Sequence, residues 1–228
     1  MGATLEHLPA LLRGLQTTAL VAALAILGCI LVSLVLGVPR AGRRRSTRVS
    51  SALAIEFFRG ASALVFLFWA YYALPLVPGM PQLSPLVASV AVLSLVGGAY
   101  GAEIVRAGLE SVPRGQIDAC RALGLRPLQA MRLVILPQAL SQIVPAFGSL
   151  AVDLVKWTSL VSFVGVQDLL YVANAVRSIT FQSMPVFVVL ALMYWLLCLI
   201  VSVVFRGLER ILPLNRALNA GGALHGAR

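Results

Sequence analysis

Five runs of apolar residues, each long enough to cross a lipid bilayer, alternate along this chain with shorter polar segments. The runs cover about residues 15–38, 52–74, 83–105, 139–166 and 186–205. A helix needs about 20 mostly apolar residues to cross the hydrocarbon core, where each backbone polar group must be paired within its own segment. The pattern therefore predicts an all-α integral membrane protein in which residues 1–228 form one domain with about five transmembrane helices.

The composition fits a chain that is mostly dissolved in lipid. Of its 228 residues 60% are hydrophobic and 11% are charged, and the mean hydropathy is +0.94, whereas soluble domains are about 25% charged. The fourth run is the least apolar, and we expect Pro145 and Gly148 to break its helix and expose backbone carbonyls to a cavity. In the third run, the spacing Gly97-x-x-x-Gly101 predicts that a neighbouring helix packs closely.

The arginines indicate the orientation of the spans, because short cytoplasmic loops carry an excess of Lys and Arg. Clusters follow the first, third and fifth runs, and their members are Arg40, Arg43, Arg44, Arg45 and Arg48; Arg106, Arg114, Arg121, Arg126 and Arg132; and Arg206, Arg210, Arg216 and Arg228. The opposite side has Arg13 and Arg177. We therefore predict that the N-terminus is extracytoplasmic and that the C-terminus is cytoplasmic.

Several classes of function are disfavoured by the same residues. The net charge of +10 is typical of nucleic-acid binding, but the arginines gather on one face of a membrane, where they meet anionic lipid. Cys29, Cys120 and Cys198 are isolated, and both histidines lie near the termini, so no disulfide, metal or His-based catalytic spacing is present. The sole lysine, Lys156, follows no glycine-rich turn. Without a P-loop, any energy from ATP must come from a partner.

The link between the third and fourth runs, residues 107–137, is too long and too regular for a simple connector. Gln116 to Leu123 is predicted to form a short amphipathic helix with Ile117, Cys120 and Leu123 on one side, ended by Gly124 in the left-handed conformation. A second helix would begin at Pro127 and end before Pro137. The prediction is a helical elbow that projects into the cytoplasm, and a hairpin that lies on the lipid surface is the alternative.

These residues resemble the EAA loop of binding-protein-dependent ABC importers, in which a permease subunit presents a coupling helix to a cleft on the ATPase subunit. The residues that carry this resemblance are Gly115, Gln116, Asp118, Ala119, Cys120, Leu123, Gly124 and Pro137. The strings Tyr100-Gly101-Ala102-Glu103-Ile104-Val105-Arg106, Lys156-Trp157-Thr158-Ser159-Leu160 and Glu56-Phe57-Phe58-Arg59-Gly60 are similar to the polar amino-acid permeases of these importers. The match extends from Gly14 to Arg210.

The resemblance implies a type I ABC importer transmembrane domain in the bacterial inner membrane. Its partners would be a second permease subunit, identical or paralogous, ATPase subunits that bind ATP and Mg, a solute-binding protein on the outer side, and membrane lipid. The chain itself would hold no cofactor or metal, contact no nucleic acid and catalyse no reaction.

The sequence departs from the family at positions that bear on the solute. Ala61-Ser62 stands where relatives have Thr-Pro, and Ser149 stands near a position commonly occupied by asparagine. Strings such as Phe66-Leu67-Phe68-Trp69 look more similar to the branch that imports ectoine and hydroxyectoine than to the histidine or glutamine branches.

Acid–base pairs at i, i+3 spacing mark a candidate solute path, since ionisable residues in spans usually face a bundle interior or a watery cavity. Glu56 precedes Arg59, and Asp153 precedes Lys156 with Ser159 nearby; Glu103 and Arg106 form a third pair near the cytoplasmic boundary. Phe66, Trp69 and Trp157 are candidates for the flat or cation-attracting walls of the path. A purely structural, self-neutralising role for each pair is equally compatible with the spacing.

Two other interpretations of the chain are a stand-alone channel or secondary transporter for small polar solutes and a membrane scaffold without transport activity. Secondary transporters usually carry an internal inverted repeat with paired broken helices. The five runs show no such duplication, which favours the importer.

Overall fold

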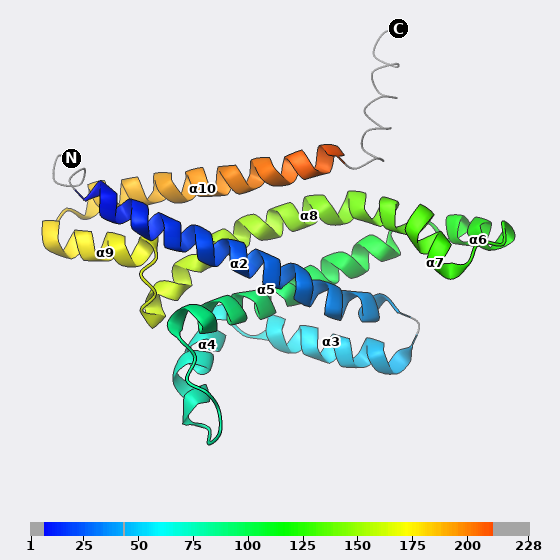
Figure 1. Cartoon of the computed structure of the whole chain (residues 1–228), viewed down its shortest axis with the longest axis horizontal. Helices are drawn as coiled ribbons and strands as arrows, with labels where there is room; N and C mark the ends of the chain where they lie inside the picture. Colours follow the sequence, from blue (N-terminus) through cyan, green and yellow to red (C-terminus); the bar gives the residue numbers. More distant parts are fainter. Residues whose placement is uncertain (1–6, 43, 212–228) are drawn as a thin grey trace, which may run out of the picture.

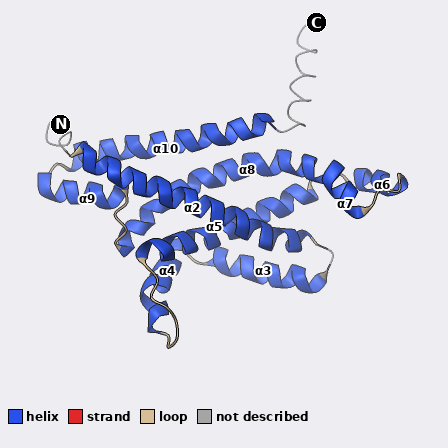
Figure 2. Ribbon diagram, in the orientation of Figure 1, coloured by secondary structure: helices blue, strands red, loops and turns tan. Residues whose placement is uncertain are grey.

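A computed structural model describes residues 7–42 and 44–211, and every regular element in these residues is helical (Figure 1, Figure 2). The elements are α2 (Leu8–Ala41), α3 (Arg45–Gly60), α4 (Ala63–Phe68), the π-helix η1 (Trp69–Ala73), the 3-10 helix η2 (Leu74–Leu76), α5 (Pro85–Glu110), α6 (Arg114–Ala122), α7 (Pro127–Ala130), the π-helix η3 (Met131–Ile135), α8 (Leu136–Trp157), the 3-10 helix η4 (Thr158–Val164), α9 (Leu169–Thr180) and α10 (Ser183–Ile211).

Four helices are long and apolar enough to cross a membrane, and a bent pair supplies a candidate fifth span. The four are Leu8–Ala41, Pro85–Glu110, Pro127–Val164 and Ser183–Ile211. They contain or overlap the predicted first, third, fourth and fifth runs. The prediction of an all-α membrane protein with about five spans is confirmed.

The second run is not one straight helix, so the prediction of a continuous span at 52–74 is wrong. Arg45–Gly60 and Ala63–Leu76 meet at 95°, and between them Ala61 is extended, with φ −121° and ψ 159°. In Figure 1 α4 accordingly points away from the direction of α3. The apolar run concealed this bend, because hydropathy is the same for one straight helix and for two helices joined at an angle.

The fourth span contradicts two other predictions, since it continues through both Pro137 and Pro145. Residues 127–164 form one span that includes α7, η3, α8 and η4. Pro137 lies in the first turn of α8, where proline is tolerated, and Pro145 lies inside α8 without ending it. Gly148 is a packing position: a Cβ added there would be 3.1 Å from the Cβ of Phe205 in α10.

The core is built on a glycine-lined contact between α2 and α5. A Cβ added to Gly98 would lie 2.4 Å from Val32, and one added to Gly101 would lie 2.1 Å from the hydroxyl of Ser33. That hydroxyl donates to the carbonyl of Gly98 over 3.2 Å. The predicted close packing at the Gly97–Gly101 spacing is confirmed: Gly101 packs against Ser33 of α2, and Gly97 packs against Leu154 of α8, whose side chain lies 2.8 Å from an added Cβ.

The helix α9, which the apolar pattern did not predict, lies at one end of the molecule. Leu169 and Ala173 of α9 pack with Leu11 of α2 and with Val186 and Leu190 of α10 in a small separate core. The N-terminal ends of α2 and α10 lie at the same end as α9 (left in Figure 1). At the opposite end lie the C-terminal ends of α2, α5 and α10 together with α6 and α7.

The arginine-rich segments thus share one end of the molecule, as the predicted orientation requires. Below, the end that holds α9 is called the outer end and the end that holds α6 is called the cytoplasmic end. Arg43, Arg216 and Arg228 lie outside the described residues.

Candidate functional site

The predicted elbow is present as α6, α7 and η3, and it projects from the cytoplasmic end (Figure 1). Five of the predicted coupling residues, Gly115, Gln116, Asp118, Ala119 and Cys120, lie on α6. Gly124 follows with φ +70°, and its amide donates to the carbonyl of Arg121 over 3.0 Å. The predicted left-handed stop is confirmed. Pro137, by contrast, belongs to the start of the membrane helix α8.

The two faces of α6 differ from the prediction at one residue. Cys120 is buried, and Ile117 is half-buried, but the Leu123 side chain is 77% exposed. Leu128 and Leu133 in the second half of the elbow are each 68% exposed. Leu123 was expected on the buried side because the helical repeat was extended one residue too far: α6 ends at Ala122. Three leucines therefore stand uncovered on the elbow.

A polar contact ties the elbow back to the fourth span. The side-chain amide of Gln138, in the first turn of α8, donates to the side-chain oxygen of Gln116 on α6. On the outward face of α6, Arg121 and Asp118 form an exposed ion pair at 2.8 Å. An exposed pair of this kind contributes only about 0.3–0.5 kcal/mol. Gln116 is thus the coupling candidate that has a direct route into a span.

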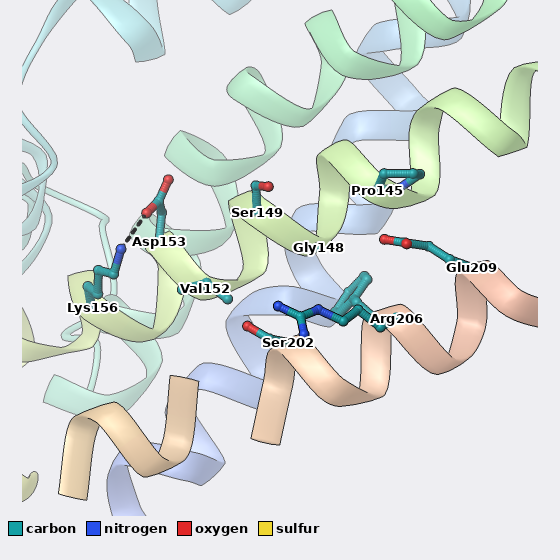
Figure 3. Close-up of a pocket in the computed structure, with 10 residues that line it drawn as sticks. Pro145, Gly148, Ser149, Val152, Asp153, Lys156, Ser202, Arg206 and Glu209 are labelled. Atoms are coloured by element: carbon teal, nitrogen blue, oxygen red, sulfur yellow. Dashed lines mark hydrogen bonds and ion pairs between the residues drawn. The ribbon is translucent and has the colours of Figure 1, made fainter. Parts of the chain in front are cut away.

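A cavity of about 360 Å³ lies between α8 and α10 and is lined by side chains of both charges (Figure 3). Asp153 and Lys156, both predicted path residues, form an ion pair at 3.1 Å on α8. Their side chains are 52% and 60% exposed within the single chain. The remaining polar lining residues are Ser149, Ser202, Arg206 and Glu209. Because lipid excludes ionisable groups, this face of the molecule requires water, solute or another polypeptide beside it.

The other predicted pair does not form. Glu56 and Arg59 are both exposed, and no ion pair joins them in the part of the chain that the structure describes. The Arg59 guanidinium instead lies over the ring of Tyr100 in α5, 5.1 Å from its centre. The Tyr100 ring is 5.7 Å from that of Trp157 at the end of α8. Arg59 and Trp157 are therefore brought together through Tyr100, while Glu56 is not part of this group.

The predicted aromatic walls divide between two places. Phe66 and Trp69 line an apolar cavity of about 210 Å³ between the bent second span and α5, together with Phe58 and Leu95. Trp157 belongs to the Tyr100 group, and Ser159 donates its hydroxyl to the Lys156 carbonyl over 2.8 Å in the 3-10 turn that follows. The predicted path residues thus occupy three neighbouring regions and do not converge in one pocket.

The third charge pair forms a network at the cytoplasmic boundary. Glu103 accepts from the Arg106 Nε over 2.7 Å, and Arg106 also contacts Glu110 over 2.7 Å. Arg40 of α2 lies 3.6 Å from the other Glu103 oxygen. The network joins the ends of α2 and α5, which favours the structural role for this pair.

The comparisons with known proteins identify this arrangement. Residues 30–212 match the family described as "Binding-protein-dependent transport system inner membrane component". The chain belongs to this family. It is a multi-pass inner-membrane permease component of a binding-protein-dependent ABC transporter, and such components are membrane transport subunits that are not themselves enzymes.

Three curated relatives cover most of the permease. The probable amino-acid ABC transporter permease protein y4tF of Sinorhizobium fredii is 40% identical over 78% of this chain and 76% of its own. The probable amino-acid permease protein YxeN of Bacillus subtilis is 36% identical over 89% and 91% of the two chains. The glutamine transport system permease protein GlnP of Escherichia coli K12 is 30% identical over 89% and 93%.

Solved structures match the fold of the permease along nearly its whole length. An amino acid ABC transporter crystallised with histidines superposes with a TM-score of 0.83 at 30% identity, covering 91% of this chain and 96% of that one. The inward-facing methionine transporter MetNI gives a TM-score of 0.74 at 20% identity, covering 91% and 98%. Both are type I ABC importer transmembrane domains, which confirms the predicted fold class.

Three residues of the site were not found from the sequence. Tyr100 was recognised only as part of a family string, Arg206 was assigned to the cytoplasmic side, and Glu209 was not singled out, although Arg206 and Glu209 line the cavity beside α8. A usable signal was present for the last two, because Arg206 and Glu209 have the same three-residue spacing as the acid–base pairs that were singled out. No signal in one sequence pairs Arg59 with an aromatic residue 41 positions away.

Proposed function

We propose that this permease moves a polar amino acid or a related zwitterion into the cytoplasm, driven by ATP that a separate subunit hydrolyses. The observation that carries the proposal is the cavity between α8 and α10, which presents carboxylates and cationic groups side by side within membrane-spanning helices. A zwitterion needs one group of each sign. Among such solutes, ectoine or hydroxyectoine is the narrower proposal.

Solute recognition in this scheme uses the two charged regions in different ways. Asp153 and Lys156 offer a carboxylate to the solute's cationic group and an ammonium to its carboxylate, by opening an ion pair that is half exposed and therefore weak. Trp157 and Tyr100 add flat walls near Arg59, against which a cationic or apolar part of the solute can lie. Glu56 contributes charge to the approach and has no ion-pair partner among the described residues.

Coupling is assigned to the elbow. The exposed Leu123, Leu128 and Leu133 lie on the elbow, at the cytoplasmic end of the fourth span, and a protein partner with a complementary cleft would cover them. The proposed partner is an ATPase subunit, which would bind ATP and Mg. Closure of two such subunits would draw two elbows together, and Gln116 and Gln138 offer the route from α6 into α8. α8 then carries the movement to Asp153 and Lys156 as a rigid rod.

A second permease subunit and an extracytoplasmic solute-binding protein complete the proposed assembly. The Asp153 and Lys156 side chains are half exposed in one chain, so a second subunit across this face would enclose them. The solute-binding protein would deliver its solute at the outer end, near α9.

The proposal is tested by uptake in cells that carry this gene together with its neighbouring ATPase and binding-protein genes. Radiolabelled ectoine, histidine, glutamine and arginine are supplied in parallel, to the native permease and to Lys156→Ala, Glu56→Ala and the conservative Lys156→Arg. We expect uptake of one of these zwitterions, a loss of at least tenfold in Lys156→Ala, and substantial retention in Lys156→Arg.

Each outcome has a different meaning. Amino-acid uptake without ectoine uptake would remove the narrower proposal and keep the importer. Unchanged uptake and unchanged solute-stimulated ATPase activity in both alanine variants would refute the assignment of the path. Uptake that persists without the ATPase gene would instead support a secondary transporter or channel.

A further inference from the structure

A buried polar junction joins four elements at the outer end of the permease. Asp168 is 0% exposed and lies in the turn between η4 and α9. One of its carboxylate oxygens accepts from the backbone amide of Tyr171 in the first turn of α9 over 2.9 Å. The other accepts from the hydroxyl of Tyr194 in α10 over 3.4 Å. Asp168 therefore caps α9 and connects it to α10.

The helix α2 contributes to the same junction through Thr18, which is also 0% exposed. The Thr18 hydroxyl accepts from the backbone amide of Leu169 over 3.0 Å and donates to the carbonyl of Gly14 over 3.0 Å. Gly14 packs against the backbone of Leu169, since an added Cβ would lie 3.0 Å from its Cα. The first amides of α9 are thus held by two side chains, one on each side of the junction.

No cation compensates the Asp168 carboxylate within the described residues. The titratable side chain that contacts this carboxylate is that of Tyr194. Thr18 of α2 and Thr158 of η4 contribute uncharged hydroxyls beside Tyr194. The charged residues that are closest in sequence to these contacts, Arg13, Lys156 and Arg177, make no ion pair with Asp168 among the described residues. Burial disfavours a charged carboxylate, and it raises the pKa of Asp168 to about 6, with the Tyr171 amide and the Tyr194 hydroxyl acting in the opposite direction.

We infer that Asp168 is a positioning residue for transport, whose carboxyl group clasps α9 to α10 beside the Thr18 contact with α2 and holds α9 most firmly in the neutral form. The role in transport rests on the proposed function, whereas the clasp itself does not. The hinge for movement is the turn before Asp168, where Gly165 has φ +85°. This left-handed conformation suits glycine and sets the direction in which the chain leaves η4.

The position of α9 matters because α9 forms one wall of an outer cavity. This cavity has a volume of about 380 Å³ and lies between η4 and α9. Ser162 and Phe163 line it from η4, and Tyr171, Asn174 and Arg177 line it from α9. η4 continues directly from α8, which carries Lys156 and Trp157. Release of α9 would widen the outer cavity next to the end of the proposed path.

The direction of the pH effect follows from comparing the clasped and released states. When α9 lifts and water reaches Asp168, its pKa returns toward the value of 3.8 for an exposed carboxyl. The clasped state therefore binds the proton more tightly than the released state, and acid favours the clasp. Between about pH 6 and pH 4, the ratio of clasped to released molecules rises up to about tenfold for each unit of acidification. Above about pH 6 the ratio is at its lowest and is constant.

Hydrogen exchange of the whole permease in lipid nanodiscs, from pH 4.5 to 7.5, measures this ratio after correction for the intrinsic exchange rate. We expect the protection of amides in residues 169–176 to rise several-fold to tenfold per unit below about pH 6 in the native protein. In Asp168→Asn, a neutral cap, the protection should be high and independent of pH. In Tyr194→Phe, which removes a donor to the ionised carboxylate, the rise should begin at higher pH. Glu110→Gln removes a distant carboxylate and should leave the α9 profile unchanged.

The same nanodisc sample separates this inference from the proposed function, because exchange requires no solute, ATPase or binding protein. A native profile that is flat, or an Asp168→Asn profile that parallels the native one, would overturn the clasp. In the assembled importer, with only the outer pH varied, we expect Asp168→Asn to abolish the pH dependence of uptake below about pH 6. Uptake with the same pH profile in both proteins would overturn the role in transport while leaving the clasp intact.

Discussion

The guanidinium of Arg59 lies 5.1 Å from the centre of the Tyr100 ring, and not beside the carboxylate of Glu56 three residues earlier. Arg59 ends the last turn of α3, immediately before the 95° bend, and Tyr100 lies in the middle of α5. The contact therefore fixes the second span at its bend against the straight helix α5. It also leaves the Glu56 carboxylate available to other groups.

A first prediction concerns this contact. Replacing Tyr100 with leucine removes the aromatic face, and we expect uptake to fall by about two- to fivefold, since a partly exposed cation–π contact contributes about 0.5–1 kcal/mol. Tyr100→Phe keeps the face and serves as the matched control. Initial rates of radiolabelled solute uptake, normalised to assembled complex, measure the effect. Equal loss in both variants would show that the hydroxyl matters and the ring does not.

A second prediction separates a structural from a functional role for Asp153 and Lys156. The double variant Asp153→Lys with Lys156→Asp retains an ion pair at i, i+3 spacing and reverses the positions of the two charges. If the pair only neutralises itself, assembly and uptake are both preserved. We expect normal assembly with uptake reduced at least tenfold, because the solute meets each charge at the wrong place. Size-exclusion chromatography of the complex and uptake assays report the two quantities independently.

A third prediction addresses the close packing of α2 on α5. An alanine at Gly98 places its Cβ about 2.4 Å from Val32, and overpacking of this kind costs about 1–3 kcal/mol. Gly98→Ala should lower the thermal unfolding temperature of the detergent-solubilised permease, and Val32→Gly in the same chain, which removes both the Cβ and the Cγ1 that would lie 2.4 Å from the new methyl group, should restore part of the loss. Gly207→Ala, where nothing lies within 4 Å, should have little effect. Failure of the second substitution to rescue would mean that the helices do not meet at this point.

A fourth prediction tests the left-handed residue of the elbow. At φ +70° a residue with a Cβ is strained by roughly 1–2 kcal/mol, whereas asparagine tolerates this conformation better. Gly124→Val should reduce the solute-stimulated ATPase activity and uptake of the assembled importer together. Gly124→Asn should retain most of both. The space around Gly124 is open, so a uniform loss in the two variants would point to the docked partner and not to the backbone.

The spans could be predicted from the sequence because an apolar run of about 20 residues is typical of a membrane-crossing helix and rare elsewhere. The bend after Gly60 could not, since neither Ala61 nor Ser62 disrupts hydropathy. Pro145 misled the prediction in the opposite direction: neighbouring helices accommodate a proline that would break an isolated helix. The helix α9 was missed because its 12 residues are too short for the pattern of a span.

In the candidate site, too, local features could be predicted and contacts between distant segments could not. Contacts within one helix, such as the ion pair of Asp153 with Lys156, follow from helical spacing and were predicted. Contacts between helices were not, because the sequence carries no distance between Arg59 and Tyr100, or between Gln116 and Gln138. The elbow could be predicted in part. Its glycine stop and its proline start are local signals, whereas the exposure of Leu123 depends on where α6 ends.

The π-helix Met131–Ile135 determines which way the elbow faces around the axis of the fourth span. A π turn holds about one residue more than an α turn, and each residue advances a helix by about 100°. The π turn therefore sets the angle, around the axis of the span, between the side that carries Asp153 and the side that carries α6. Neither α6 nor α8 determines this angle by itself. Loss of one residue from this turn would swing α6 about a quarter of a revolution around the span and separate Gln116 from Gln138.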